Sequence, residues 1–561
     1  MNLPSLKTLT ILPFLLLALS CSKDSSDDKN EPTYPSNPNT ITNYDQLVTF
    51  FMDWRQFRAP EMKDGVPDYS SDAMEKQQQA LKKWQDELNA ADTSGWPIKQ
   101  QVDWYLVLAE MNGLDFAHRV KKPWSRDPAF YVWFYPNQSD VPEREGPNIH
   151  GCIEMPDYSW PLSDDEATEI AQRLRKGPAV MEQAKTNLTG DARDLWITGA
   201  RSIREQSVAL EVFAEKTKDD HPDLAAAAIE LRDASNAFAN WLDNQAPSKT
   251  SSSGVGKDNY TWNLKNVHLL PYSWEEEKLL MERELARSHS ALRFFEHRNR
   301  KLPKLNKFDN AQDLELAQQT AVTEFMNFLE KEEVLTLKNY MDPALREQLG
   351  SYSPNDGIRG FFSEIGYRDA IVMRTHHYHW IELARMKEEP NGSPIRKIPL
   401  RYNIFDGRAE GLATAMEELM MNAGLLENRP RAKELIWILL AQRAARGLGG
   451  LYQHGLEMNL EEACAYASKW TPWGLLPADG GTIKHEEQFY LRQPAYGTSY
   501  VIGKLEIDKL IAEYARQRNG VFVLKDFMDE LNQVGVIPVS LVYWQMTGDK
   551  SMLEAALTPK Y

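Results

Sequence analysis

Residues 273–302 read SWEEEKLLMERELARSHSALRFFEHRNRKL, and this stretch predicts one long helix. Ser273 is expected to be its N-cap, because a serine hydroxyl accepts a hydrogen bond from a backbone N–H of the first turn. Residues 72–91 and 223–244 place apolar side chains three and four positions apart, which also predicts helices. Another helix is expected at 310–332. Alternating strand patterns and fixed-period repeats are scarce, so the predicted class is all-α, with few or no strands.

The bulk composition limits the architecture and the partners. A chain of 561 residues is too long for one ordinary core, so two subdomains or one large helical body are expected. The net charge of −17 repels phosphate backbones, which argues against nucleic acid as a partner. Sixteen Trp and twenty-two Tyr could line a cleft for an organic ligand, although most of them are expected in the core.

The N-terminus resembles a bacterial lipoprotein signal. Lys7 precedes the apolar run LTILPFLLLALS (9–20), which is too short to span a bilayer and ends just before Cys21. We predict a signal peptide over 1–20 and lipidation of Cys21, with an ordinary secretory signal as the alternative. Acidic residues just after Cys21 resemble the surface-export signal of Bacteroidetes lipoproteins. The expected location is therefore the bacterial outer membrane, on its periplasmic or surface-exposed face, and the lipid is the only expected membrane contact.

The rest of the chain divides into four predicted segments. Residues 21–43 are polar and proline-bearing and form a flexible tether, which an N-terminal helical region follows over 44–245. Within that region, residues 121–142 hold prolines and aromatics that exclude a continuous helix. Residues 246–259 are expected to be a linker or loop, and 260–561 a C-terminal helical region. Cys152 and Cys464 form no disulfide framework, and whether they pair stays open.

Three histidines gather in MRTHHYHWIELARM (373–386). If this stretch is helical, His376, His379 and Leu383 share one face and His377 points elsewhere. Two histidines at this spacing can converge on a metal ion, but an isolated pair is more often structural.

A pair of carboxylates follows in AEGLATAMEELMMNAGLL (409–426). Glu410, Thr414 and Glu417 lie on one helix face, and Glu418 lies off it. An exposed acidic stripe is one interpretation. The small and apolar residues around the two carboxylates favour the other, an inward-facing functional pair.

Two further segments carry candidate residues. Residues 441–463 place His454 on one helical stripe with Arg443 and Gly450, and a lone histidine of this kind is usually structural. Residues 490–510 bring Tyr500 and Gly503 near one face. A tyrosine there could donate to a developing oxyanion, while a glycine there could equally mark close helix packing.

In this order, the segments resemble the bacterial family called domain of unknown function 885, whose members are helical, zinc-peptidase-like proteins. The family pattern E-G-W-A-x-Y-A-E is similar to EGLATAMEEL (410–419), and P-G-Q-A-x-S-Y-x-x-G is similar to PAYGTSYVIG (494–503). His454 matches the histidine of D-x-G-x-H, and DFMDELNQVGVIP (526–538) resembles the last motif. With GVGKDNYTWNLKNVHLLPYSWEEE (254–277), the resemblance covers about Gly254 to Pro538.

The departures from the family pattern bear on chemistry. The family pattern H-E-x-x-P-G-H-H-L-Q begins with an H-E pair. This chain has Met373 and Arg374 at the pair, so the glutamate that would activate a zinc-bound water is missing. His379 takes the place of a later histidine of that motif. Gly450 stands for the aspartate of D-x-G-x-H, and Met528 for a late histidine.

The resemblance implies a lipid-anchored, hydrolase-like enzyme with a deep central cleft for a small organic or peptide-like substrate. Zinc or another divalent ion would be held by His379, Glu410 and His454, although whether metal binds stays open. Candidate catalytic residues are Glu410, Glu417 either as a general base or as a residue that supports the reacting groups, Tyr500 as an oxyanion donor, His376, His377 and Arg374. The alternatives are a non-catalytic surface lipoprotein that binds a ligand or partner, and a metal-free lyase or isomerase.

Overall fold

The structure, a computed structural model, describes residues 41–353 and 360–558. Within these ranges helices dominate, and the strands form only two two-stranded sheets, which confirms the all-α prediction. The antiparallel sheet pairs β1 (Met62–Lys63) with β2 (Val66–Pro67), and the parallel sheet pairs β3 (Phe134–Tyr135) with β4 (Ile153–Glu154).

The helices of the N-terminal half are α1 (Tyr44–Arg58), α2 (Ser71–Asn89), α3 (Ile98–Phe116), the π-helix η1 (Ala117–Lys121), α4 (Pro123–Arg126), η2 (Pro128–Tyr131), η3 (Met155–Asp157), α5 (Asp164–Leu174), α6 (Gly177–Asn187), α7 (Arg193–Thr217), α8 (Pro222–Gln245) and η4 (Ala246–Ser248). Those of the C-terminal half are α9 (Lys257–Asn266), α10 (Trp274–Arg298), α11 (Ala311–Lys331), α12 (Met341–Arg346), α13 (Phe361–Gly366), α14 (Ala370–His376), α15 (Tyr378–Glu388), α16 (Asp406–Asn422), α17 (Ala432–His454), α18 (Leu460–Trp470), η5 (Pro472–Gly474), α19 (Gly481–Arg492), α20 (Tyr496–Gln517), α21 (Leu524–Val534), α22 (Val539–Thr547) and α23 (Ser551–Leu557).

The long helices lie where the apolar spacing predicts them. Ser273 is the N-cap of α10 and forms a capping box: its hydroxyl accepts from the Glu276 N–H at 3.2 Å, and the Glu276 carboxylate accepts from the Ser273 N–H at 2.8 Å. Helices α2, α8 and α11 coincide with the other predicted helices. Residues 121–142 break into short pieces, as their prolines require.

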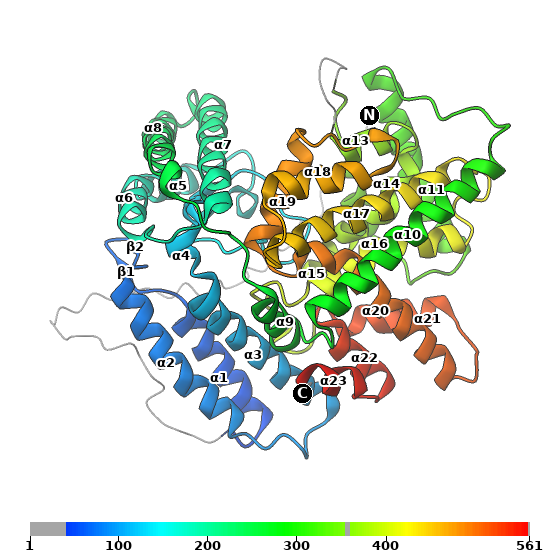
Figure 1. Ribbon diagram of the computed structural model, residues 1–561, viewed down its shortest axis with the longest axis horizontal. Helices are drawn as coiled ribbons and strands as arrows, with labels where there is room; N and C mark the ends of the chain where they lie inside the picture. The colour runs from blue at the N-terminus through cyan, green and yellow to red at the C-terminus, as the bar shows by residue number, and fades with distance from the viewer. Residues whose placement is uncertain (1–40, 354–359, 559–561) are drawn as a thin grey trace, which may run out of the picture.

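Helix α17 is the centre of the C-terminal half (Figure 1). From Glu434 to His454 every residue is buried, because α10, α18, α19 and α20 pack around it. Helices α1–α3 and α5–α8 form separate groups on the other side of the molecule (Figure 1). The core residues of α5–α8 form their own hydrophobic cluster together with residues from 124–134.

Two glycines allow α16 and α20 to approach closely. A Cβ on Gly411 would lie 2.5 Å from the Cα of Gly503, and a Cβ on Gly503 would lie 2.8 Å from the Cα of Gly411. No larger side chain fits between these backbones. This contact brings the first turns of α20, which carry Tyr496 and Tyr500, against Glu410 on α16.

The histidine-rich stretch is not one helix. Helix α14 ends at His376 and α15 begins at Tyr378, because His377 between them has φ −65° and ψ 8°, outside the α-helical region. His376 and His379 therefore belong to different helices. Their ring centroids are nevertheless 5.1 Å apart, so the bend keeps the two imidazoles together.

The structure adds two facts about the cysteines and the membrane. Cys152 and Cys464 are both free thiols. Within residues 41–353 and 360–558, every helix is too short or too polar to cross a membrane. Cys21, the predicted lipidation site, lies outside the described residues.

Candidate functional site

Glu410 is the centre of a buried polar cluster. Its Oε2 lies 3.1 Å from Nε2 of His379, and its Oε1 accepts a hydrogen bond from the Tyr496 hydroxyl. Burial alone would raise the pKa of Glu410, but His379 and hydrogen bonds from Tyr496 and Tyr500 hold it below its usual range. Burial alone would lower the pKa of His379, but Glu410 outweighs burial and raises it to about 9. The two side chains therefore form a buried ion pair at neutral pH.

His376 approaches the same carboxylate from α14. One ligand atom each of His376, His379 and Glu410 lie within 4.8 Å of one another. The Nδ1 of His376 is 3.2 Å from Nη2 of Arg443 and 3.4 Å from Oε1 of Glu417. Burial and then the Arg443 cation hold the pKa of His376 well below its usual range, so the ring is neutral and able to bind a metal ion.

Two acids from the N-terminal half complete the cluster. Asp140 and Glu145, in the loop after β3, also offer ligand atoms within 4.8 Å of each other and of Glu410. Burial, and then Asp140, raise the pKa of Glu145 to about 7. Ser139 donates to Glu145 at 2.6 Å, and the Tyr496 oxygen lies 3.3 Å from it. Because the Tyr496 proton is given to Glu410, a protonated Glu145 can donate to that oxygen.

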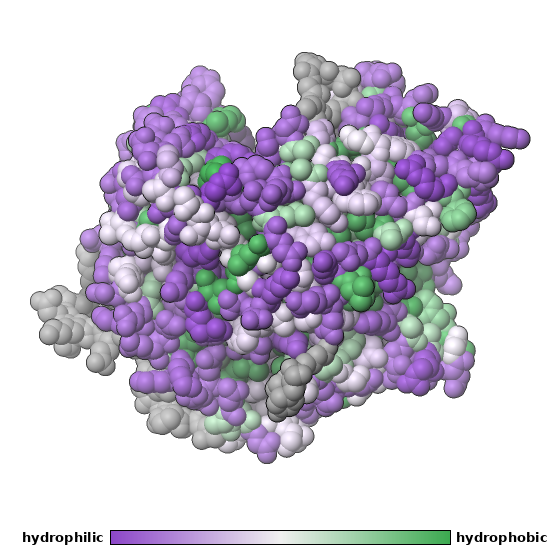
Figure 2. Space-filling view, viewed as in Figure 1, coloured by the Kyte–Doolittle hydropathy of each residue, from purple (hydrophilic) through white to green (hydrophobic). Residues whose placement is uncertain are grey.

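A cleft of about 580 Å³ reaches these acids. Asp140 and Glu145 line it together with Trp380 of α15, which follows His379, and with side chains of α7 and α19 such as Glu205 and Phe489. Figure 2 shows the surface notched between the region of α7 and that of α18 and α19, with mainly hydrophilic residues on the view shown. The cleft is within the size range of small-molecule sites.

Other predicted residues take supporting or separate places. Glu417 is fully buried in an ion pair with Arg443 at 2.7 Å, and burial raises its pKa to about 7. Tyr500 is buried beside Glu410, with the Arg446 guanidinium 4.7 Å from its ring centre.

Three predicted residues lie outside the two clusters that could hold a metal ion. The Nε2 of His454 lies 3.0 Å from the carbonyl oxygen of Tyr490. Of the three metal donors predicted from the sequence, the structure therefore brings together His379 and Glu410 but not His454. His377 is half-buried, and its buried Nδ1 makes no hydrogen bond with a described residue. Arg374 is 3% exposed, and its Nε and Nη1 find no hydrogen-bond partner among the described residues.

Sequence reasoning missed Asp140 and Glu145. Asp140 lies at the end of the Pro- and aromatic-rich stretch and Glu145 just after it, in a segment without helical or strand periodicity. They meet Glu410 only through a tertiary contact across some 270 positions, which no local spacing encodes. The only indication in the sequence was that two acids, Asp140 and Glu145, stand at or just after the end of an irregular stretch rich in aromatic residues.

The comparisons with known proteins identify the family. The sequence model of a bacterial protein family of unknown function, DUF885, matches residues 55–351, more than half of the chain. The chain belongs to the DUF885 family. The matched range overlaps the motif resemblance only over about 254–351, so the residues around Glu410 lie beyond it. No curated protein sequence matches the chain.

Two solved structures share the fold with this DUF885 protein. One, from Shewanella oneidensis, is described as a candidate lipoprotein of unknown function; it is 15% identical, with a TM-score of 0.64, and the match covers 90% of this chain and 100% of that one. Another candidate lipoprotein, from Colwellia psychrerythraea, is 14% identical with a TM-score of 0.64, covering 91% of this chain and 99% of that one. At this identity the likeness establishes the fold alone.

Proposed function

We propose that this protein is a lipid-anchored hydrolase that uses a divalent metal ion, bound by His376, His379 and Glu410, on a small organic or peptide-like substrate. The observation that carries the proposal is the convergence of two imidazoles and one carboxylate beside an open cleft. This set replaces the His379, Glu410 and His454 set expected from the sequence, with His376 in place of His454. Lipidation of Cys21 would hold the enzyme at the outer membrane.

The donor set fits a zinc-like ion, which would displace the proton that His379 shares with Glu410. Two imidazole nitrogens and one carboxylate oxygen form a familiar three-ligand set that leaves a position open for water or substrate. Ligand atoms about 2 Å from an ion in tetrahedral geometry lie roughly 3.3 Å apart. The ligand atoms of His376, His379 and Glu410 lie within 4.8 Å of one another, so the side chains must draw together slightly to reach that spacing.

Glu417 and Arg443 orient His376. Nη2 of Arg443 donates to Nδ1 of His376 at 3.2 Å, and this hydrogen bond fixes the orientation of the ring. Arg443 is also ion-paired with Glu417 at 2.7 Å, so Glu417 positions His376 through Arg443.

Glu145 is the proposed acid–base group. It lines the cleft, and its pKa of about 7 lets it both take up and release a proton near neutral pH. When bound, a divalent ion polarises a carbonyl or phosphoryl oxygen and acidifies a bound water. Glu145 would take the proton of the attacking water, and Tyr496, between Glu145 and Glu410, would hold both carboxylates in place.

Hydrolysis assays test the proposal. Chelator-treated protein would be reloaded with Zn²⁺, Mn²⁺ or Co²⁺ and tested on ester, peptide and phosphoester panels. We expect turnover that depends on metal and falls about 100-fold or more in Glu145→Gln, the range of general acid–base catalysis. Glu388→Gln, on the exposed end of α15, is the matched control and should remain active. Metal-independent turnover, or full activity of Glu145→Gln, would contradict the proposal.

Arg374 supports a second candidate, a ligand-binding lipoprotein or a metal-free acid–base enzyme. The family pattern has the water-activating glutamate at this position, whereas here a buried guanidinium has nitrogens that make no hydrogen bond to any described residue. If no metal supports turnover, the wild type and Arg374→Ala are compared without metal. Activity in the wild type that Arg374→Ala loses with its fold intact selects the metal-free enzyme. A wild type with no activity on any substrate selects the binding protein.

A further inference from the structure

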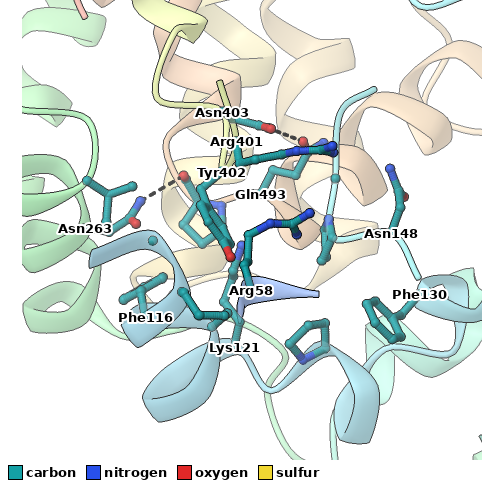
Figure 3. A pocket seen from close by; sticks show the side chains of 18 of the residues that line it. Arg58, Phe116, Lys121, Phe130, Asn148, Asn263, Arg401, Tyr402, Asn403 and Gln493 are labelled. Atoms are coloured by element: carbon teal, nitrogen blue, oxygen red, sulfur yellow. Dashed lines mark hydrogen bonds between the residues drawn. The ribbon is translucent and has the colours of Figure 1, made fainter. Parts of the chain in front are cut away.

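A second cavity, the basic pocket, lies behind the loop that carries Asp140 and Glu145. It has a volume of about 130 Å³ and lies between the end of α1, η1, the segment before α16 and the start of α20. Figure 3 shows Arg58, Lys121, Arg401 and Tyr402 around it, with the guanidinium ends of both arginines extending toward the side where Asn148 lies. Arg144 and Asn148 line the basic pocket and the cleft alike.

The lining of the basic pocket is strongly positive in an acidic protein. Four cationic side chains, Arg58, Lys121, Arg144 and Arg401, face it with a single carboxylate, that of Glu143. Glu143 pairs with Arg401, and Arg144 is paired with a different acid, Glu154, at 2.7 Å.

Two of these cations form no ion pair with a described residue, although Asp127 and Asp406 act on Lys121 from beyond contact distance. Among the residues described, no carboxylate oxygen lies within 4.0 Å of the Lys121 ammonium or of the Arg58 guanidinium. The Nε atoms of Arg58 and Arg401 are buried without a hydrogen-bond partner. Burial, and then Arg492, lower the pKa of Lys121 to about 8, so it is still charged at pH 7. Cations without an ion-pair partner are costly in a partly enclosed site unless an anion joins them.

We propose that the basic pocket binds an oxyanion group, a carboxylate or a phosphate, through Arg58, Lys121 and Arg401. Guanidinium and ammonium donors match such groups with charge-assisted hydrogen bonds, and the hydroxyl of Tyr402 adds a neutral donor. A cavity of about 130 Å³ has room for a few water molecules, which suits one oxyanion group rather than a whole peptide. The proposal is independent of the metal site.

Calorimetric titration tests the pocket directly. Inorganic phosphate and succinate would each be titrated into the full-length protein at pH 7, with a chelator present so that no anion binds through a metal. The variants are Lys121→Met and Arg58→Met. Lys122→Met is the control, because Lys122 is the exposed neighbour that does not line the pocket.

We expect wild type and Lys122→Met to bind at least one of the two anions, and each pocket variant to bind about tenfold to a hundredfold more weakly, as loss of a charged hydrogen bond requires. Phosphate alone, succinate alone, or both identify the group. Lys121→Met should also raise the Tm of the anion-free protein, since it removes a cation that forms no ion pair with a described residue; this shows that the variant folds. Absence of binding by either anion, or equal binding by Lys121→Met, would overturn the proposal.

Discussion

Replacing Gly503 by alanine tests whether the contact between α16 and α20 positions the site. The added Cβ would lie 2.1 Å from the carbonyl oxygen of Gly407 and 2.8 Å from the Cα of Gly411. Both obstacles are backbone, so the helices must separate by about 1.3 Å to reach an ordinary contact of 3.4 Å. Overpacking of this kind costs roughly 1–3 kcal/mol, and the upper end applies because no flexible side chain can yield. The helix propensity of alanine returns about 1 kcal/mol, so a net loss of about 2 kcal/mol is expected.

Urea unfolding of Gly503→Ala measures this loss, followed by far-UV circular dichroism and tryptophan fluorescence; the free energy is interpretable where the two transitions coincide. Gly407→Ala is the matched control on the same helix pair, because its Cβ would meet nothing closer than 3.9 Å. It should unfold at nearly the wild-type urea concentration. If Gly503→Ala proves as stable as this control, the close-contact reasoning is wrong.

Three further predictions concern charge and location. His118 is buried, and burial lowers its pKa to about 4 from the usual 6.5. Because the unfolded chain then binds the proton more readily than the folded one, the free energy of unfolding should fall by up to about 3 kcal/mol as the pH drops from 6.5 to 4. His118→Gln should flatten that part of the profile of unfolding free energy against pH, and an unchanged profile would refute the assignment. Arg374→Met should raise the Tm, because it removes a buried cation whose Nε and Nη1 have no hydrogen-bond partner in the described part of the chain, whereas a lower Tm would reveal a stabilising role. Cys21→Ser should move the protein from the membrane to the soluble fraction, and retention in the membrane would exclude the lipid anchor.

The local pattern of apolar residues and helix caps predicted the positions of the long helices, but only some of the residues around Glu410. Apolar spacing and caps, such as Ser273 with Glu276, act within a few residues, so α2, α8, α10 and α11 lie where expected. Glu410 and His379 were singled out because their segments occur in the same order as the motifs of the family. The spacing of the histidines did not reveal the bend at His377.

The remaining site residues depend on long-range packing. His454 occupies the position of a family motif histidine, yet its ring turns to the carbonyl of Tyr490. Asp140 and Glu145 reach Glu410 only because the loop after β3 folds over α16 and α20. Such contacts are set by the whole core, and a single sequence shows neither which motif residues converge nor which loop closes over them.

Zinc titration into chelator-treated, untagged protein tests the central claim most directly. The account predicts one ion per chain for wild type, about 100-fold weaker binding for His379→Ala and Glu410→Gln, and wild-type affinity for His454→Gln, because His454 lies outside the His376–His379–Glu410 cluster. Absence of stoichiometric binding by wild type, or equal binding by Glu410→Gln, would contradict the metal site.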